Sequence, residues 1–332
     1  MFDLDAHPEV FAPEPAAPNA GELPVLHVLM ASPRGFCAGV RRAIDAVRDA
    51  LRLHGAPVYV RRPIVHNLHV VRELEAEGAR FVEELDEVPE GGVVVLSAHG
   101  VAPAVTEEAR RLGLTAYDAV CPLVARVHRE VERHFRAGRH VVLVGHQGHP
   151  EIVGTLGRLP EGAASLVRTA ADAAALPMEP DTPVGVAIQT TYSVDEAAEV
   201  VVALRARFAD LALPPSGDIC YATTNRQAAV RAIAPRADAL IVAGERFSSN
   251  ACRLAELASA AGCPKVQLIA DPGELDWALL PRGGTVGITA AASTPERVVT
   301  AILARLAGRY RMTIEEIEAA VETTAFRAVA VA

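Results

Sequence analysis

The sequence contains no apolar run approaching the roughly 20 residues that a membrane-spanning helix needs, although 51% of its residues are hydrophobic. A secretory signal is also missing, because Asp3 and Asp5 stand where such a signal carries Lys or Arg, and no apolar stretch follows them. Positive charge is not in excess, since the formal net charge is −9. These absences predict a cytoplasmic protein that uses neither a membrane nor nucleic acid as its main partner.

Cysteine is scarce, with five residues in a chain of 332, and none belongs to a close C-x-x-C pair. Disulfides are not expected in the reducing cytoplasm, so each cysteine is a buried thiol, a nucleophile or a metal ligand. The chain is too long for one average domain and suggests two or three units built around separate cores.

The two ends of the chain carry no obvious chemical motif. Residues 1–24 hold five prolines and little periodic hydrophobicity, which predicts a flexible tail. Residues 313–321 have the pattern of a short amphipathic helix capped by Thr313 and followed by a small apolar tail. Residues 307–332 are therefore predicted to form a C-terminal helix and tail.

The middle of the chain repeats itself. Cys37, Cys121 and Cys220 each open a helical segment, and their separations are similar, at 121 − 37 = 84 and 220 − 121 = 99 residues. A short β-branched run follows each of these segments and ends in a polar cluster. Strands that alternate with helices at this spacing indicate parallel sheets. The prediction is an α/β protein with three pseudo-repeated parallel units, at residues 25–120, 121–217 and 218–306.

Each unit also has a second apolar strand that ends in small polar residues. In parallel sheets, functional groups gather beyond the carboxyl ends of the strands. A pseudo-threefold arrangement would therefore turn six strand ends and three helix-start cysteines toward one central cavity. The side chains expected at the strand ends are His66, His99, His149, Glu151, Thr190, Ser248, Ser249, Asn250 and Ser293.

Three converging thiolates suit a soft metal centre. Structural zinc sites usually close four ligands around the ion and use close cysteine pairs, so three isolated cysteines fit zinc poorly. Iron–sulfur clusters normally take four thiolates, so three would leave one iron open to a substrate. Buried cysteines acting as small hydrophobic residues are the plain alternative, but their shared register disfavours it.

The polar strand ends indicate an anion site, because helix N-termini and compact hydrogen-bond donors bind phosphate. The sequence has neither a G-x-x-x-x-G-K-[ST] loop nor a D-D-x-x-D magnesium cluster. With these two motifs absent, the pattern favours a diphosphate that is held without magnesium, directly by neutral and imidazole donors. The serines and Asn250 could also be simple helix caps, and the two roles are compatible because a bound anion takes the same free amides.

Glu151 falls in the first turn of a predicted helix, where the helix dipole favours any carboxylate. It also lies two residues after His149, at a strand end among the predicted anion donors. A carboxyl group desolvated there could have a raised pKa and act as a general acid. The general acid is the favoured interpretation.

Eight motifs stand in order along the chain: P-R-G-F-C-A-G-V (33–40), I-V-H-N (64–67), S-A-H-G-V (97–101), C-P-L-V (121–124), G-H-x-G-H-P-E (145–151), Q-T-T-x-S-V-D (189–195), D-I-C-Y-A-T-T-N-R-Q (218–227) and S-S-N (248–250). Together they resemble the motifs of the 4-hydroxy-3-methylbut-2-enyl diphosphate reductase (LytB/IspH) family, and the resemblance runs from about Leu26 to Leu306.

The resemblance implies a trefoil of three α/β units around one [4Fe–4S] cluster, with Cys37, Cys121 and Cys220 as ligands and one iron open. It implies that Thr190 and Glu151 handle the substrate hydroxyl and its proton. The residues implied to hold the diphosphate are His66, His99, His149, Ser248, Ser249, Asn250 and Ser293.

The implied reaction removes the hydroxyl of (E)-4-hydroxy-3-methylbut-2-enyl diphosphate to give isopentenyl and dimethylallyl diphosphate. This is the last step of the methylerythritol phosphate route to isoprenoids. A ferredoxin or flavodoxin is implied as the electron donor.

The chain departs from the family pattern without losing a ligand or the acid. The departures are Ser32, Arg41, Arg62, Pro63, Val120 and Ala291. They leave open a divergent paralogue that acts on another allylic diphosphate. A zinc hydrolase that uses the three cysteines and a non-catalytic anion-binding relative are alternatives from other classes. Cys252 and Cys263 match no family ligand and are interpreted as structural.

Arginines cluster around the first cysteine, at Arg34, Arg41, Arg42 and Arg48, and near the neighbouring strand end, at Arg61 and Arg62. They predict either a solvated mixed-charge helix face, with Asp45 and Asp49 as local partners, or a docking patch for an acidic ferredoxin. The first interpretation is slightly favoured.

Overall fold

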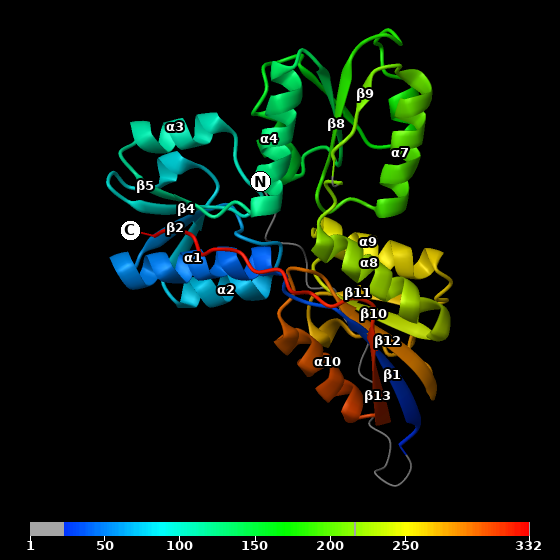
Figure 1. Cartoon of the computed structure of the whole chain (residues 1–332). Helices are drawn as coiled ribbons and strands as arrows, with labels where there is room; N and C mark the ends of the chain where they lie inside the picture. Colours follow the sequence, from blue (N-terminus) through cyan, green and yellow to red (C-terminus); the bar gives the residue numbers. More distant parts are fainter. Residues whose placement is uncertain (1–22, 216, 332) are drawn as a thin grey trace.

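The computed structural model describes residues 23–215 and 217–331. The predicted N-terminal tail lies outside the described residues, apart from Leu23 and Pro24. Three α/β lobes meet at a common centre (Figure 1), which confirms the predicted fold class. Among the described residues, no helix is both long and apolar enough to cross a bilayer.

The first lobe is a four-stranded parallel sheet in the order β3-β2-β4-β5. Its strands are β2 (Val58–Arg61), β3 (Ala79–Val82), β4 (Val93–Leu96) and β5 (Thr115–Asp118). Its helices are α1 (Ala38–His54), α2 (Leu68–Ala76) and α3 (Pro103–Arg111), with the 3-10 turn η1 (Leu85–Glu87).

The second lobe repeats this plan with the strand order β7-β6-β8-β9. Its strands are β6 (His140–Val144), β7 (Ala164–Val167), β8 (Val184–Ile188) and β9 (Leu211–Ala212). Its helices are α4 (Pro122–Arg136), α5 (Pro150–Leu156), α6 (Ala170–Ala174) and α7 (Val194–Arg207).

The third lobe has five parallel strands in the order β11-β10-β12-β1-β13. Its strands are β1 (Val25–Ser32), β10 (Ala239–Ala243), β11 (Val266–Ile269), β12 (Gly284–Ala290) and β13 (Arg311–Glu318). Its helices are α8 (Tyr221–Ile233), α9 (Ser249–Ala260) and α10 (Glu296–Ala307), with 3-10 turns η2 (Ala234–Arg236) and η3 (Pro272–Glu274).

Strand β1 occupies in the third lobe the place that β5 and β9 occupy in the other two, because it follows β12 in the sheet as they follow β4 and β8. The predicted first unit, which began at residue 25, therefore included a strand of the third lobe, and this part of the prediction is wrong. The cause is pairing with distant residues: β1 matches β12 from Leu26 to Met30, and the local pattern around β1 does not reveal that partner.

The predicted helix at residues 313–321 is also wrong, because this stretch forms most of β13. That strand pairs with β1 at eight successive positions, from Val25 with Arg311 to Ser32 with Glu318. The free edge of β1 offers a row of backbone groups that need partners, and this pairing outweighs the helical spacing of Ile314 and Ile317. Ile314 stays 55% exposed at this edge, so burial does not drive the choice.

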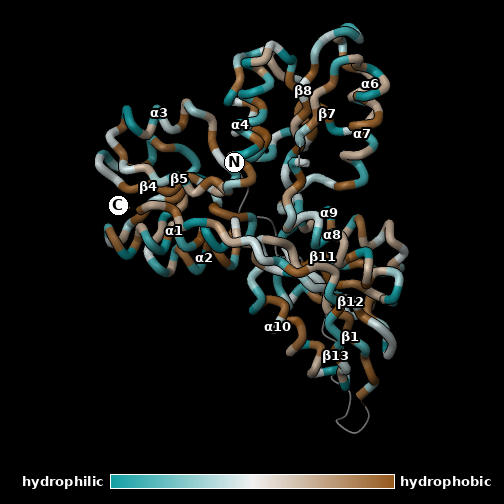
Figure 2. The backbone as a smooth tube through the Cα atoms, viewed as in Figure 1, coloured by the Kyte–Doolittle hydropathy of each residue, from teal (hydrophilic) through white to brown (hydrophobic). Residues whose placement is uncertain are grey.

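Each lobe has its own apolar core between sheet and helices. In the first lobe, α1 turns Ala43, Ile44 and Val47 inward at helical spacing and packs them against the β-branched residues Val58 and Val60 of β2. Figure 2 shows hydrophobic stretches along the strands and mixed stretches along helices such as α1. The separate cores leave the junction of the three lobes free for polar side chains.

Candidate active site

The three predicted cysteines are the N-cap residues of α1, α4 and α8, the first long helix of each lobe. Each cysteine N–H donates to a carbonyl beyond a central strand: Cys37 to Ala292 at 3.3 Å, Cys121 to Ala98 at 3.0 Å, and Cys220 to Thr190 at 3.0 Å. Every bond joins a cysteine to the lobe that precedes it in the trefoil. The three cysteines are therefore placed equivalently, at the joints between lobes.

Burial raises the pKa of Cys121 to about 12 and that of Cys220 to about 11, so both would be neutral thiols in the absence of a compensating charge. A soft metal centre supplies that compensation, because metal binding replaces the thiol proton. The amide of Val40 points at Cys37 Sγ and that of Thr223 at Cys220 Sγ, at 3.5 and 3.4 Å. Helix N-termini thus face the sulfurs and favour negative charge there.

The space around the sulfurs fits a cluster better than a single ion. Zinc–sulfur bonds of about 2.3 Å bring the sulfurs of one zinc site within about 4 Å of each other. In the described part of the chain, no three His, Cys, Asp or Glu side chains are grouped closely enough to share one metal ion. Cluster ligands bind different irons, so wider spacing suits them. A Cβ added at Gly39 would lie 2.8 Å from Cys121 Sγ, so the glycine keeps room at the centre.

One central cavity, of about 110 Å³, collects every side chain predicted for the site. Among its lining residues are Cys37, Cys121, Cys220, His66, His99, His149, Glu151, Thr190, Ser248, Ser249, Asn250 and Ser293. The six strand ends therefore meet as the repeat predicted, and each lobe contributes to the same wall.

Three histidines from two lobes pack together on one side of this cavity. The ring centroid of His66 lies 4.2 Å from that of His99 and 5.6 Å from that of His149. Burial lowers the pKa of His66 to about 4 and that of His149 to about 3, and it holds the pKa of His99 well below its usual value. All three rings are thus neutral near pH 7 when no anion is present.

Two hydrogen bonds settle which atoms face the cavity as donors. The amide of Glu151 donates to His149 Nδ1 at 3.2 Å, so the proton of the neutral ring lies on Nε2. The amide of Ala292 donates to Asn250 Oδ1 at 2.9 Å, which leaves Nδ2 as the free end. Among the described residues, His66 Nε2, His149 Nε2 and Asn250 Nδ2 are buried atoms without a hydrogen-bond partner.

Unsatisfied buried polar atoms cost free energy, so a cavity that collects three of them is built to take a polar ligand. Ser248 caps α9 and lies, with Ser249 and Asn250, at the N-terminus of that helix. Ser293 Oγ donates to the carbonyl of His66 at 3.0 Å, which joins the first and third lobes beside the histidines. Neutral donors together with a helix N-terminus are the groups that suit an anion.

Glu151 and Thr190 form a buried pair on the second lobe. The Thr190 amide and hydroxyl both donate to the Glu151 carboxyl group, each at 2.7 Å. Glu151 is 2% exposed, and burial raises its pKa to about 7 even though the Thr190 bonds oppose the shift. A carboxyl group that is half protonated near neutral pH and lines the cavity can supply a proton.

Several supporting residues were not predicted as part of the site. Asp218 is buried, accepts a bond from the Ile188 amide at 2.9 Å, and has a pKa raised by burial to about 6. Arg226 is fully buried and donates to the carbonyl of Gly35, just before Cys37. Both belong to the motif at residues 218–227, where the sequence singled out only the cysteine. No local signal marked Arg226, because α8 also carries Asn225, Gln227 and Arg231.

The fold and the cavity define a class: a three-lobed α/β enzyme that combines soft sulfur donors, neutral anion-binding donors and one buried acid. Known proteins with a similar sequence belong to one enzyme family. The family described as LytB protein matches residues 28–307, and the chain belongs to this family. The resemblance inferred from the eight motifs is thereby confirmed.

Known relatives cover almost the whole chain. A 4-hydroxy-3-methylbut-2-enyl diphosphate reductase of Phenylobacterium zucineum is 55% identical over 306 residues, which are 92% of this chain and 96% of that protein. One of the same name from Gluconobacter oxydans is 54% identical over 88% of each chain.

Two solved structures are also similar. The E-1-hydroxy-2-methyl-but-2-enyl-4-diphosphate reductase of Plasmodium falciparum superposes with a TM-score of 0.86 at 34% identity, over 93% of this chain and 96% of that one. A structure described as the terminal enzyme of the non-mevalonate pathway gives a TM-score of 0.61 at 34% identity, over 85% of this chain and 99% of that one.

Proposed function

We propose that this protein is a 4-hydroxy-3-methylbut-2-enyl diphosphate reductase that catalyses the terminal step of the non-mevalonate route to isoprenoids. The substrate loses its hydroxyl as water, taking up two electrons and two protons, and becomes isopentenyl or dimethylallyl diphosphate. The observation that carries the proposal is the meeting of three cysteines, a buried acid and three unsatisfied donors in one cavity of a LytB-family chain.

The diphosphate binds to the wall formed by the histidines and the start of α9. His149 Nε2–H and Asn250 Nδ2–H are donors that have no other partner among the described residues, and His66 Nε2 lies beside them. An anion placed there raises the pKa of the neighbouring imidazoles, because negative charge favours their protonated form. His99 from the first lobe and Ser248, Ser249 and Ser293 from the third complete the predicted set.

The substrate hydroxyl lies toward Thr190 and Glu151. The Thr190 hydroxyl donates to the Glu151 carboxyl group and can turn its lone pairs or its proton toward a substrate oxygen. Glu151 is the proton source, since its pKa of about 7 keeps a protonated fraction at neutral pH. The Ile188–Asp218 bond fixes the strand end that carries Thr190.

The resident group that suits the three cysteines is one [4Fe–4S] cluster with Cys37, Cys121 and Cys220 as ligands. When bound, it supplies electrons one at a time and leaves one iron without a protein ligand. The chain holds the three sulfurs at helix N-termini, where the cysteines are half-buried. The electrons come from a ferredoxin or a flavodoxin in the cytoplasm.

The side chains that depart from the family pattern lie outside the central cavity, although Val120 directly precedes Cys121 and Ala291 directly precedes the lining residue Ala292. Ser32 and Arg41 line a second, larger cavity of about 550 Å³ beside α1, and Arg62 pairs with Glu84 at 2.8 Å on the surface of the first lobe. The residues around the central cavity include none of the six departing positions. This placement favours the family substrate over another allylic diphosphate.

The test is turnover by the anaerobically purified protein, with a chemical reductant and the synthetic substrate. We expect isopentenyl and dimethylallyl diphosphate to form only when both substrate and reductant are present. Diphosphate binding without any product under these conditions would show a non-catalytic relative instead.

A further inference from the structure

The C-terminal segment, residues 319–331, has no regular secondary structure and crosses from one lobe to another. It leaves the end of β13 in the third lobe, where the Ala319 amide donates to the Ser32 carbonyl at 2.8 Å. Figure 1 shows it running across the junction to the first lobe beside α1. Val329 and Val331 then pack against the core of the first lobe. The segment is thus anchored at both ends.

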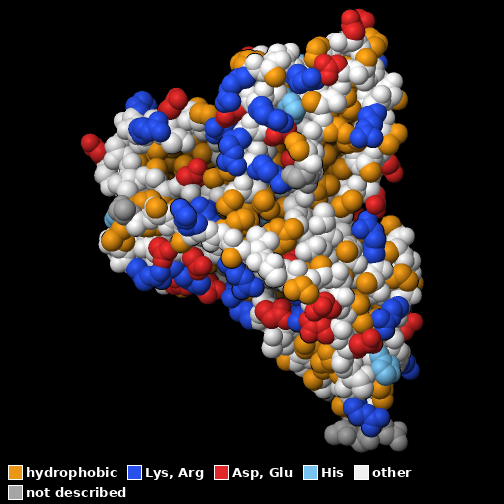
Figure 3. Space-filling model, in the orientation of Figure 1, with side chains coloured by type: hydrophobic (Ala, Val, Ile, Leu, Met, Phe, Trp, Pro, Cys, Tyr) orange, Lys and Arg blue, Asp and Glu red, His pale blue; other side chains and the backbone are white. Residues whose placement is uncertain are grey.

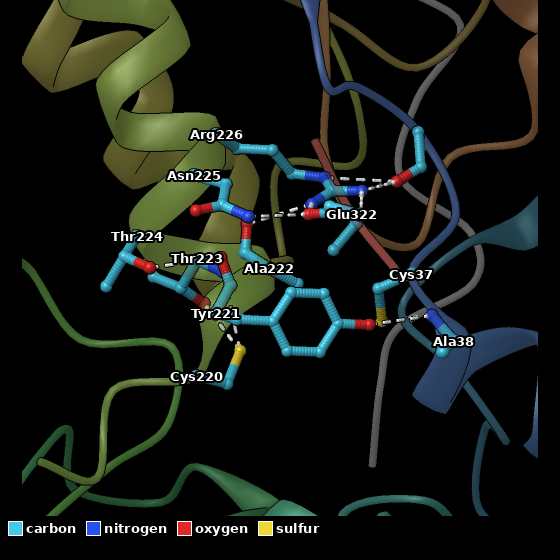
Figure 4. A network of polar contacts seen from close by, with 12 residues as sticks. Cys37, Ala38, Cys220, Tyr221, Ala222, Thr223, Thr224, Asn225, Arg226 and Glu322 are labelled. Carbon is cyan, nitrogen blue, oxygen red and sulfur yellow. Dashed lines mark hydrogen bonds and ion pairs between the residues drawn. The ribbon is translucent and has the colours of Figure 1, made fainter. Parts of the chain in front are cut away.

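Near its start, this segment supplies Glu322, the counter-ion of Arg226. The guanidinium of Arg226 is fully buried and pairs with Glu322 at 2.8 Å. Its Nε and Nη2 atoms donate to the Gly35 carbonyl at 3.1 and 2.6 Å, and Nη1 donates to Ala222 at 2.9 Å. Figure 4 shows Arg226 and Glu322 next to the segment that contains Cys37. One side chain therefore joins the helix of Cys220 to the loop of Cys37.

Tyr221 makes a second bond across the same joint. Its hydroxyl accepts from the Ala38 amide at 3.2 Å, directly beside Cys37 (Figure 4). Because Tyr221 follows Cys220 and Ala38 follows Cys37, this bond connects the first turns of α8 and α1. The two cysteines are thus linked through both of their neighbours.

Arg42 has the matching role between Cys37 and Cys121. From the second turn of α1 it donates to the carbonyls of Ala119 and Val120 at 3.3 and 2.9 Å, just before Cys121. Its Nε donates to the Arg327 carbonyl of the C-terminal segment at 2.9 Å. Arg42 and Arg226 therefore join the three cysteine loops pairwise, and the same segment holds both guanidiniums.

A buried guanidinium needs its counter-ion, because an unpaired charge in a low-dielectric interior is strongly disfavoured. Among the described residues, Glu322 is the carboxylate that pairs with Arg226. Removing it would expose Arg226 to a penalty that the protein can relieve only by moving the Gly35 loop or admitting water. Either response disturbs Cys37 while the lobes themselves stay folded on separate cores.

We propose that residues 319–331 form a positioning strap for the three-cysteine centre, in which Glu322 and the Arg327 carbonyl fix Arg226 and Arg42. Glu322 is thereby a positioning residue that acts through Arg226 and touches neither cluster nor substrate. The strap rests on the proposed function, since it requires a cluster on the three cysteines.

The test compares Glu322→Gln with Glu318→Gln, a matched change at an exposed carboxylate at the end of β13. Both full-length proteins are purified anaerobically, and iron release to a chelator and the electron paramagnetic resonance spectrum of the reduced cluster are recorded. Circular dichroism checks the fold. We expect iron release to be about tenfold faster in Glu322→Gln, in line with other supporting groups of metal sites, with an altered spectrum. Glu318→Gln should match the wild type.

A third variant, Glu322→Asp, keeps the charge and should restore much of the wild-type behaviour. Wild-type release rates and spectra in Glu322→Gln would overturn the strap. So would a loss of thermal stability in the cluster-free protein with no change in the spectrum, because that marks a merely structural contact. Wild-type protein without iron would overturn the proposed function and the strap together, so the two failures are distinguishable.

Discussion

The burial and hydrogen bonds of Glu151 explain its proposed role as the general acid. Its carboxyl group is buried, is bonded twice by Thr190, and has a pKa of about 7. Glu151→Gln keeps the shape and most hydrogen bonds but removes the transferable proton. We expect kcat to fall by about a hundredfold or more, the usual size of a general-acid contribution, with substrate affinity nearly unchanged.

Steady-state kinetics with a chemical reductant checks this prediction. Glu130→Gln serves as the control, because Glu130 pairs with Arg133 and His134 of α4, outside the cavity. Wild-type kcat in Glu151→Gln would mean that the carboxylate only stabilises the start of α5.

The same carboxyl group predicts a pH dependence. With a pKa raised to about 7, its acid form predominates below pH 7 and is lost as the pH rises above it. If proton donation limits kcat, kcat should fall about tenfold per pH unit well above pH 7. A plot of kcat against pH measures this fall. The residual activity of Glu151→Gln should show no such fall above pH 7. The same alkaline fall of kcat in the variant would mean that a group other than Glu151 causes it.

Gly39 predicts a purely steric effect at the cluster site. It lies in the first turn of α1, and alanine there favours the helix by about 1 kcal/mol. The added Cβ would nevertheless approach Cys121 Sγ to 2.8 Å. We expect Gly39→Ala to fold normally, as judged by thermal unfolding of the cluster-free protein, and to bind substantially less iron. Full iron content in this variant would contradict the proposed packing.

At the scale of single residues, the sequence predicted the residues that line the cavity better than the residues that support them. The side chains lining the cavity follow strand ends and helix starts, which local patterns reveal. Arg226 and its partner Glu322 are 96 residues apart, and nothing near Glu322 marks it as the counter-ion of a buried arginine. Such long-range ion pairs become visible only when the chain is folded.

The helices α1, α4 and α8 carry the central prediction at the scale of elements. Each begins with a cysteine, so replacing Cys37, Cys121 or Cys220 by serine keeps an N-cap residue while removing a soft ligand. We expect each variant to fold but to lose the cluster, measured as iron and labile sulfide per chain.

The controls are the two cysteines outside the site. Cys252 Sγ contacts the Arg246 carbonyl, and Cys263 Sγ contacts that of Lys265, so serine at either position should leave iron content unchanged. Full cluster retention in any variant of the first group would exclude that cysteine as a ligand.

The strands show where prediction from local pattern succeeds and where it fails. The short β-branched run predicted after each cysteine helix is a strand in the structure, β2, β6 or β10, because buried β-branched runs are distinctive. Strands β1 and β13 were misassigned because their pairing partner is each other, across almost the whole chain. The lobe boundaries are therefore shifted relative to the predicted units. Each cysteine lies at the junction where one lobe ends and the first long helix of the next lobe begins.

At the scale of the whole molecule, the structure shows that most arginines of the predicted docking patch are engaged within the protein. Arg48 pairs with Glu73 and Glu77, each at 2.7 Å, and acidic and basic side chains intermingle over α1 and α2 (Figure 3). Arg42 is engaged with backbone carbonyls of the cysteine loops. Arg41 is exposed, lies over the Phe36 ring, and has no carboxylate partner among the described residues. Arg34 pairs with Glu296 and Glu316, and both Arg61 and Arg62 pair with Glu84. Among the arginines of the predicted patch, Arg41 therefore remains the candidate for docking an acidic electron donor.

Arg41→Glu should therefore slow ferredoxin-driven turnover at low salt, by an amount that shrinks as salt screens the charges. Turnover with a chemical reductant should not change. Arg52→Glu reverses a charge near the far end of the same helix and should affect neither assay. An equal loss with both electron sources would show that Arg41 serves the fold or the substrate site.

The proposed function requires an iron–sulfur cluster at the centre of the trefoil. The most direct measurement is the iron and acid-labile sulfide content of the anaerobically purified protein, followed by turnover with substrate and an excess of chemical reductant. We predict about four irons and four sulfides per chain, and loss of the substrate hydroxyl with two electrons taken from the reductant for each product molecule. Zinc in place of iron, or a reduced cluster that leaves the substrate intact, would contradict it.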